Sequence, residues 1–341
     1  MRLLAAAVGV LTFAAAGPAA AQDAAAFGVA PWAEAVISVR EIARSSAFLL
    51  GGGWRVVAEG TVARSELAYW RLPTTATARF ARLCARGATT GCVRFVHFVN
   101  AGPQRPIRLA ARPWDTGGIF SVMLRTDNVQ REFDRAIALG WWAESEPYPL
   151  EFGGSRLINV VVEGPNGVNY ALYERSTPRF TAFAVTPLSQ GFNAMRMVAD
   201  QPSAVRFYRD RLGFRAVFDA PFVDPRAQPT NFSVPANLAP TLVRRAAALG
   251  PGEGESGRVE VMQLEGFVGR TFAALASPPN FGIISLRYPV ADLVGYLRTI
   301  ERRDVHPAYA ANRVVVAGLG TLDLVAVRDP DGNLTEFFHA D

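Results

Sequence analysis

The fold of this chain is decided by two stretches of its second half, FYRDRLGF at residues 207–214 and VRDPDGNLTE at residues 327–336. The first predicts the end of an amphipathic helix, a glycine turn and the start of a β-strand. The second places Asp, Pro and Gly where a type I turn prefers them, and alternating side chains follow. Both stretches therefore predict a junction that leads into a strand.

The same features recur in the first half of the chain. Gly53-Trp54-Arg55 corresponds to Gly213-Phe214-Arg215 about 160 residues later, and GPNG at 164–167 corresponds to DPDG at 329–332. A fixed offset of this kind indicates a duplication. Each copy divides again into two units that start with an alternating strand and continue into an amphipathic helix and further short strands. The four first strands are predicted at Glu34–Val39, Ser121–Thr126, Asn193–Val198 and Ile283–Tyr288.

The predicted fold class is α+β, with four βαβββ units. A helix covers only one face of the sheet in such a unit, so two units placed side by side can curl their free faces into a ligand-binding cup. We expect two domains of two units each, residues 22–176 and 191–341, joined by a linker at residues 177–190. The second domain carries the two deciding stretches, and the first domain is the more degenerate copy.

The N-terminal segment predicts export. Residues 1–21 combine Arg2, an apolar run from Leu3 to Ala16 and three small residues before Gln22, which is the pattern of a signal peptide. The apolar run is short for a membrane span, and no cysteine follows it to carry a lipid anchor. The expected mature protein is therefore periplasmic and has no stable membrane anchor.

Composition narrows the chemistry. The chain has 341 residues, 35 basic and 30 acidic side chains, and three histidines. All the basic residues are arginine, so a Schiff-base lysine and a P-loop lysine are excluded. Three histidines are too few for a His-rich metal site. The arginines are interleaved with acids, which favours a solvated surface over a nucleic-acid partner.

The two cysteines, Cys84 and Cys92, flank a turn-rich stretch between two alternating runs. In an oxidising compartment they form either a disulfide that closes this hairpin or two free thiols, and the first alternative is favoured. A catalytic thiol is not expected, because no histidine or acid lies close in sequence.

The two deciding stretches, together with Val198-Ala199-Asp200, resemble the vicinal oxygen chelate superfamily, which includes glyoxalases, extradiol dioxygenases, fosfomycin-resistance proteins and bleomycin-binding proteins. The N-terminal copy resembles it more faintly, through Glu41, Phe48 and Gly53-Trp54. The resemblance covers the whole expected mature chain and implies two tandem domains. It says little about the reaction, since one fold hosts many chemistries.

The resemblance also implies four metal-ligand positions in each cup. They fall on Asn193, Glu260, Ile283 or Ser285, and Glu336 in the C-terminal copy, and on Glu34, Arg94, Ser121 and Ala171 in the N-terminal copy. None of them is a histidine. Extradiol dioxygenases need two histidines and a glutamate, so an Fe(II) site of that type is not expected.

Glu260 and Glu336 are the candidate catalytic residues. Each alternates with large apolar side chains on a strand, so each carboxylate is expected to point into a cup. Two carboxylates in one dry cup repel each other unless a cation or a shared proton intervenes. A divalent ion held by both, with Asn193 as third ligand, would be Mg²⁺ or Mn²⁺ rather than Zn²⁺ or Fe. The alternatives are one protonated glutamate acting as general acid/base, or a structural ion pair with Arg258, Arg287 or Arg196.

Other residues complete the predicted site. The substrate cup is expected to be lined by Met195, Met197, Ser285 and Phe338. Residues 220–240, rich in Pro and Asn, are either a lid over the second cup or a packed surface excursion. In the first cup, Arg94 is expected either to pair with Glu34 or to face an anionic ligand.

The predicted function is binding of a small oxygen-rich molecule in the C-terminal cup. The first hypothesis adds a metal-dependent, glyoxalase-like lyase or isomerase reaction, in which the ion polarises a carbonyl and a glutamate moves the proton. The second is a non-catalytic binding or sequestration protein that resembles the bleomycin-binding relatives.

Overall fold

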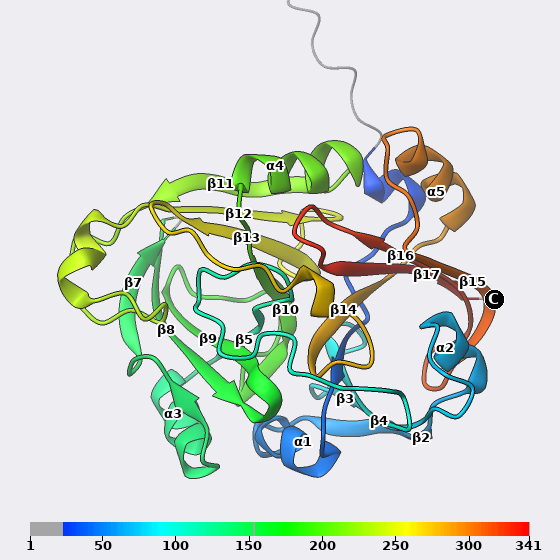
Figure 1. The fold of residues 1–341 in the computed structure, drawn as a ribbon. Helices are drawn as coiled ribbons and strands as arrows, with labels where there is room; N and C mark the ends of the chain where they lie inside the picture. The colour runs from blue at the N-terminus through cyan, green and yellow to red at the C-terminus, as the bar shows by residue number, and fades with distance from the viewer. Residues whose placement is uncertain (1–22, 153, 341) are drawn as a thin grey trace, which may run out of the picture.

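The structure, a computed structural model, describes residues 23–152 and 154–340. The predicted signal peptide, residues 1–21, lies outside the described residues. Four βαβββ units follow one another along the chain and build two curled sheets (Figure 1). The predicted α+β class is therefore confirmed.

The first and fourth units flank the other two units in sequence. The first unit consists of β1 (Glu34–Ser38), α1 (Ile42–Gly51), β2 (Arg55–Thr61), β3 (Thr77–Cys84) and β4 (Cys92–Val99), with an additional helix α2 (Arg64–Tyr69) between β2 and β3. The fourth unit consists of β14 (Gly282–Pro289), α5 (Leu293–Glu301), β15 (Tyr309–Val316), β16 (Gly320–Arg328) and β17 (Leu334–Ala340).

The second and third units lie between them. The second unit consists of β5 (Ser121–Thr126), α3 (Val129–Ala138), β6 (Trp142–Ala143), β7 (Tyr148–Phe152), β8 (Ser155–Gly164) and β9 (Val168–Thr177). The third unit consists of β10 (Leu188–Met197), α4 (Gln201–Arg206), which a π-helical turn extends to Arg211, β11 (Arg215–Phe222), β12 (Arg244–Gly250) and β13 (Arg258–Leu264). The predicted linker at 177–190 thus ends inside β10.

The sheets combine the units differently from the predicted domains. One sheet has the order β15-β16-β17-β14-β1-β4-β3-β2 and joins unit 1 to unit 4, while the other runs β11-β12-β13-β10-β5-β9-β8-β6 and joins unit 2 to unit 3. The seams are the antiparallel pairs β1–β14 and β5–β10. The pairing of units within residues 22–176 and within 191–341 is therefore wrong. We call the concave faces of these sheets the 1/4 cup and the 2/3 cup.

Connection length explains this pairing. Units 2 and 3 are joined only by residues 178–187, whereas the longer segments 100–120 and 265–281 carry the chain from one sheet to the other. These two segments run side by side and bond to each other, with Ile107 N donating to Phe281 O at 2.8 Å and Phe272 N donating to Thr116 O at 2.8 Å. The two crossings thus support each other.

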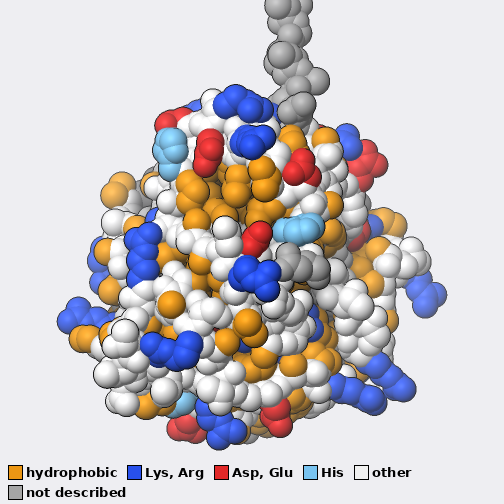
Figure 2. Space-filling model, turned by 90° about the vertical axis from the view of Figure 1, so that its right-hand side faces the viewer, with side chains coloured by type: hydrophobic (Ala, Val, Ile, Leu, Met, Phe, Trp, Pro, Cys, Tyr) orange, Lys and Arg blue, Asp and Glu red, His pale blue; other side chains and the backbone are white. Residues whose placement is uncertain are grey.

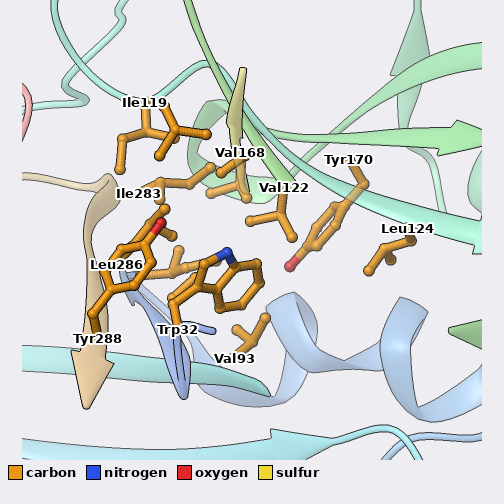
Figure 3. Packing of buried hydrophobic residues seen from close by; sticks show 14 of the residues in the cluster. Trp32, Val93, Ile119, Val122, Leu124, Val168, Tyr170, Ile283, Leu286 and Tyr288 are labelled. Atoms are coloured by element: carbon orange, nitrogen blue, oxygen red, sulfur yellow. The ribbon is translucent and has the colours of Figure 1, made fainter. Parts of the chain in front are cut away.

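One apolar cluster joins the outer faces of both sheets to helices α1, α3, α4 and α5. Figure 3 shows Trp32 inside this cluster, with Val122 of the 2/3 sheet and Val93 of the 1/4 sheet nearby. The sheets come closest at Gly91 and Gly191, where Gly191 N donates to Gly91 O at 2.9 Å. A Cβ on Gly191 would lie 2.3 Å from the Trp32 ring. The approach of the two sheets therefore depends on the missing side chain.

Figure 2 shows the face that lies on the right of Figure 1, where basic side chains are interspersed with acidic and uncharged ones. Several surface arginines are paired with acids, as Arg209 is with Asp210 at 2.7 Å. Among the described residues, no helix is both long and apolar enough to cross a bilayer.

The predicted disulfide is confirmed: Cys84 and Cys92 are joined at the ends of the paired strands β3 and β4. Both cysteines are buried. The bridge closes a short loop at the edge of the contact between the two sheets.

We predict that the double variant Cys84→Ser, Cys92→Ser lowers the free energy of unfolding by about 2–3 kcal/mol, because the open loop gains conformational entropy in the unfolded chain. Urea denaturation of both proteins measures this difference. Wild-type protein unfolded in the presence of a reductant should reproduce the shift. Equal stability of the oxidised wild type and the variant would contradict the prediction.

Candidate functional site

The 1/4 cup is filled by the chain itself. Helix α2 lies against β15 inside the cup (Figure 1). Its residues Leu67 and Tyr69, together with Trp70, pack with Phe98 and Phe338 of the sheet. The helix therefore covers the concave face of this sheet.

A network of buried ion pairs lies beneath α2. Arg287 is its centre, with nitrogen-to-oxygen distances of 3.0 Å to Glu34, 2.9 Å to Glu66 and 2.5 Å to Glu336. Arg94 also pairs with Glu66, with 3.0 Å between its Nη2 and the carboxylate. The side chains of these five residues are fully buried.

Two further contacts close the network. Arg82 Nε donates to Glu34 at 2.8 Å, and Trp70 Nε1 donates to Glu336 at 3.3 Å. Three guanidinium groups thus balance three carboxylates. Arg94 also lies over the Phe80 ring, with its guanidinium carbon 3.9 Å from the ring centre.

The charges stabilise each other against burial. Desolvation alone would raise the pKa of Glu34, but the surrounding guanidinium groups, that of Arg94 foremost, outweigh it and lower the pKa. Desolvation alone would likewise lower the pKa of Arg287, and the three carboxylates, that of Glu336 foremost, raise it well above its usual value. Both shifts favour the charged forms of Glu34 and Arg287. Because a charge buried without its partners is strongly unfavourable, the network holds as a unit.

The sequence predictions for this cup are partly corrected. Glu336 and Glu260 do not meet, because β17 and β13 belong to different sheets. Glu336 is instead engaged by Arg287, which is one of the arginines named as a structural partner. Arg94 pairs with Glu66 rather than with Glu34. The guanidinium of Arg287 lies between the carboxylates of Glu34, Glu66 and Glu336.

The 2/3 cup is open. It holds a cavity of about 310 Å³, which falls at the lower end of the range for small-molecule sites. Its floor is apolar and is formed mainly by methionine and aromatic side chains of the sheet: Met123, Tyr173, Phe192, Met195, Phe218 and Met262. Strand alternation places these side chains on the concave face.

Of the four predicted cup residues, Met195 and Met197 belong to the apolar cluster of the 2/3 cup, and Met195 lines the cavity. Ser285 and Phe338 lie on β14 and β17 of the other sheet, so their assignment to the same cup is wrong. They were grouped with Met195 because the sequence suggested that units 3 and 4 share a sheet.

Glu260 is the buried acid of the cavity. Asn193 Nδ2 donates to its Oε2 at 3.1 Å, across the parallel pair β10–β13. Burial raises the pKa of Glu260 to about 7, although the hydrogen bond from Asn193 and the charge of Arg258 act in the opposite direction. This carboxyl group can therefore exchange a proton with a bound molecule near neutral pH.

The residues of the 2/3 cup do not fit a divalent-metal site. The positions implied by the resemblance are here Ser121, Ala171, Asn193 and Glu260, which supply only one carboxylate. The Oδ1 atom of Asn193 already accepts a hydrogen bond from Ala194 N at 2.8 Å. Across the described ranges, no group of three His, Cys, Asp or Glu side chains could hold a metal ion. The expected Mg²⁺ or Mn²⁺ site at Glu260, Glu336 and Asn193 is therefore not formed.

The rim of the 2/3 cup carries a cluster of arginines. Arg125, Arg175 and Arg258 face a single acid, Glu255, at 3.1 Å, 3.5 Å and 3.5 Å. All four residues line the cavity. The alternation from Met123 to Arg125 could have placed Arg125 in the cup from sequence, but the shared glutamate comes from a loop that only the fold brings close.

Part of the segment 220–240 covers the cup. Phe222, Asn231 and Phe232 line the cavity, and Asn231 and Phe232 are buried. Tyr148 of β7 donates its hydroxyl to Asn231 at 2.9 Å, which attaches the segment to the opposite wall. Of the two alternatives for this segment, the structure thus favours a cover over a cup.

We predict that Arg287→Met costs at least about 3–5 kcal/mol of unfolding free energy or prevents folding, because three buried carboxylates lose their common partner. Urea denaturation and the yield of soluble protein measure the loss. Glu336→Gln keeps Arg287 between two glutamates, so it should fold with a smaller loss of about 1–3 kcal/mol. Replacement of the exposed Arg298 by Met is the control, and an Arg287 variant as stable as this control would refute the prediction.

We also predict that Glu260 makes the protein less stable as pH rises. Below pH 4.5 the carboxyl group of Glu260 is protonated in both the folded and the unfolded state. Between pH 4.5 and about 7 the unfolded chain releases this proton more readily than the folded one, so the free energy of unfolding falls by ~3 kcal/mol. Above pH 7 the loss levels off. Comparing wild type with Glu260→Gln by urea denaturation at pH 4.5, 6 and 8 isolates this effect. Glu301→Gln, at an exposed position, is the control. Parallel pH profiles for wild type and Glu260→Gln would disprove the assignment.

Comparisons with known proteins agree with this geometry. Residues 193–337 match the family model of the Glyoxalase/Bleomycin resistance protein/Dioxygenase superfamily. No curated protein sequence matches the chain.

Solved structures show the same fold over nearly the whole chain. Glyoxalase I from Zea mays superimposes with a TM-score of 0.59 at 13% identity, covering 91% of this chain and 92% of that one. A mutant of the same enzyme gives a TM-score of 0.58 at 13% identity, with 91% and 93% covered. At this level of identity the likeness concerns the fold. Residues 193–337 thus match the glyoxalase family model, and the chain as a whole has the fold of glyoxalase I, with four units in two cups.

Proposed function

We propose that this protein binds a small organic molecule in the 2/3 cup and does so without a divalent metal. The observation that carries the proposal is the contrast between the cups. One is filled by α2 and a charge-balanced network, whereas the other holds a cavity of about 310 Å³ with an apolar floor and a few polar groups. Cavities of this composition are the usual form of small-molecule sites.

The polar groups suggest how the ligand is oriented. Glu260 and Asn193 offer a proton-exchanging carboxyl group and an amide on the floor of the cavity, and Asn159 and Asn231 lie on its wall. Such groups select oxygen-bearing molecules, because each ligand oxygen must be matched on burial. Of the two hypotheses drawn from the sequence, the non-catalytic binding protein has the stronger support, because the residues of the cup do not fit the divalent ion that the lyase or isomerase reaction would use.

Export remains part of the proposal. The buried disulfide between Cys84 and Cys92 suits an oxidising compartment such as the periplasm. The signal peptide itself stays a prediction.

We predict that Ala248→Trp abolishes binding in the cup. Ala248 lines the cavity opposite Glu260 on the neighbouring strand, so an indole there would occupy the space of a ligand. The neutral dye Nile red, which brightens in apolar sites, serves as a probe, and wild type should bind it with at least about ten-fold higher affinity than the variant. Val315→Trp, on an exposed strand position of the other sheet, should bind like wild type.

The same proteins test whether binding is independent of a metal. Adding Mg²⁺ or Mn²⁺ after EDTA treatment should change neither dye affinity nor thermal stability. A stoichiometric ion found after purification, or a stabilisation by either metal that Glu260→Gln removes, would refute metal independence. Equal dye binding by wild type and Ala248→Trp would refute the cup as the site.

A further inference from the structure

Arg244 is a buried cation with no ion-pair partner among the described residues. It lies at the start of β12, lines the cavity of the 2/3 cup and is 2% exposed. Its Nε and Nη2 atoms are buried and make no hydrogen bond to any described residue. Burial lowers its pKa, and no ion pair restores it.

The other buried arginines show that this is unusual in the molecule. Within residues 23–152 and 154–340, six arginines are buried, and five of them have a carboxylate within 4.0 Å: Arg82, Arg94, Arg125, Arg196 and Arg287. Arg244 is the sixth. Asp224 acts on it only at longer range, because its carboxylate is bound by Arg226 and Gln228.

The unpartnered edge of Arg244 has a specific geometry. Nε and Nη2 form one edge of the planar guanidinium group, where two N–H groups point in nearly the same direction. This fork matches the two oxygens of a carboxylate, which is the arrangement that gives the strongest charge-assisted hydrogen bonds. Burial of an unpaired cation lowers the stability of the fold, so a ligand anion bound there would be stabilised by the charge and would offset this loss.

The residues around Arg244 indicate the chemistry of the rest of the ligand. Its guanidinium carbon lies 5.2 Å from the ring centre of Phe222 and 5.8 Å from that of Phe232. Along β12, Ala246 and Ala248 continue the cavity toward Glu260, which lies roughly 13 Å away at the usual strand rise. The space between the cation and the acid is apolar.

We propose that Arg244 is the carboxylate-recognition residue of the 2/3 cup and that the ligand is an organic acid with an apolar, aliphatic or aromatic body. The carboxylate binds the guanidinium group of Arg244, the body lies on the methionine and phenylalanine side chains of the cavity, and the far end reaches Glu260 and Asn193. This inference rests on the proposed function, since it names the ligand class of the same cavity.

The test uses hexanoate, octanoate, benzoate and 3-phenylpropionate, each with its uncharged primary amide, in calorimetric titrations of the mature protein at fixed ionic strength. We expect at least one carboxylate to bind about ten-fold or more tightly than its amide. Arg244→Met should remove this preference and leave amide binding within about two-fold. Two controls remove one positive charge elsewhere: Arg175→Met on the rim of the same cavity and Arg245→Met on the outer face of β12. Both should change the preference less than three-fold.

A ligand-free measurement supports the assignment independently of the probes. Arg244→Met should unfold about 2–4 °C higher than wild type, because it removes an uncompensated buried charge. A lower melting temperature would show that Arg244 is held by the fold itself and would overturn the inference.

The remaining outcomes separate the two proposals. If Nile red binds and no carboxylate is preferred to its amide, or if Arg175→Met has the same effect as Arg244→Met, the inference fails and the cup remains a binding site. If neither Nile red nor any probe binds, the proposed function fails, and this inference fails with it.

Discussion

The antiparallel pairing of first strands, β1 with β14 and β5 with β10, is the constraint on which the rest of the structure depends. A βαβββ unit covers one face of its sheet with its own helix, and the free face needs a partner. The pairing at the seams decides which two units share a concave face. It therefore also decides which charged side chains meet, and it keeps Glu260 apart from Glu336.

The two cups show two ways to handle buried charge. In the 1/4 cup, Arg287 stands among three glutamates where a cation is needed, and α2 closes the space above it. Each charge of this network has a partner of opposite sign, so the charges stabilise one another without a ligand. In the 2/3 cup, Asn193 donates a hydrogen bond to Glu260, and among the described residues no carboxylate lies within 4.0 Å of Arg244. Incomplete compensation of this kind is typical of a binding site.

Periodicity made much of the fold predictable. The first strands, the helices after them, the DPDG turn and the cysteine hairpin follow from spacing of two or 3.6 residues and from turn chemistry. Gly332 N indeed donates to Asp329 O at 2.9 Å, as the turn requires. The candidate site was less predictable, because α2 was not recognised in the short stretch between two strands. Arg244 could not be predicted either, because nothing in the sequence distinguishes an unpaired arginine from the other arginines.

The sequence by itself thus determined the four units, their order and the polar residues at the start of their strands. Local rules suffice for these features, because each depends on residues that are close along the chain. Only the tertiary structure decided that unit 1 joins unit 4 and unit 2 joins unit 3, since a strand's hydrogen bonds can be satisfied by any partner of matching length. That choice, set by the two crossing segments, made one cup a closed ionic core and left the other as a cavity with an uncompensated arginine.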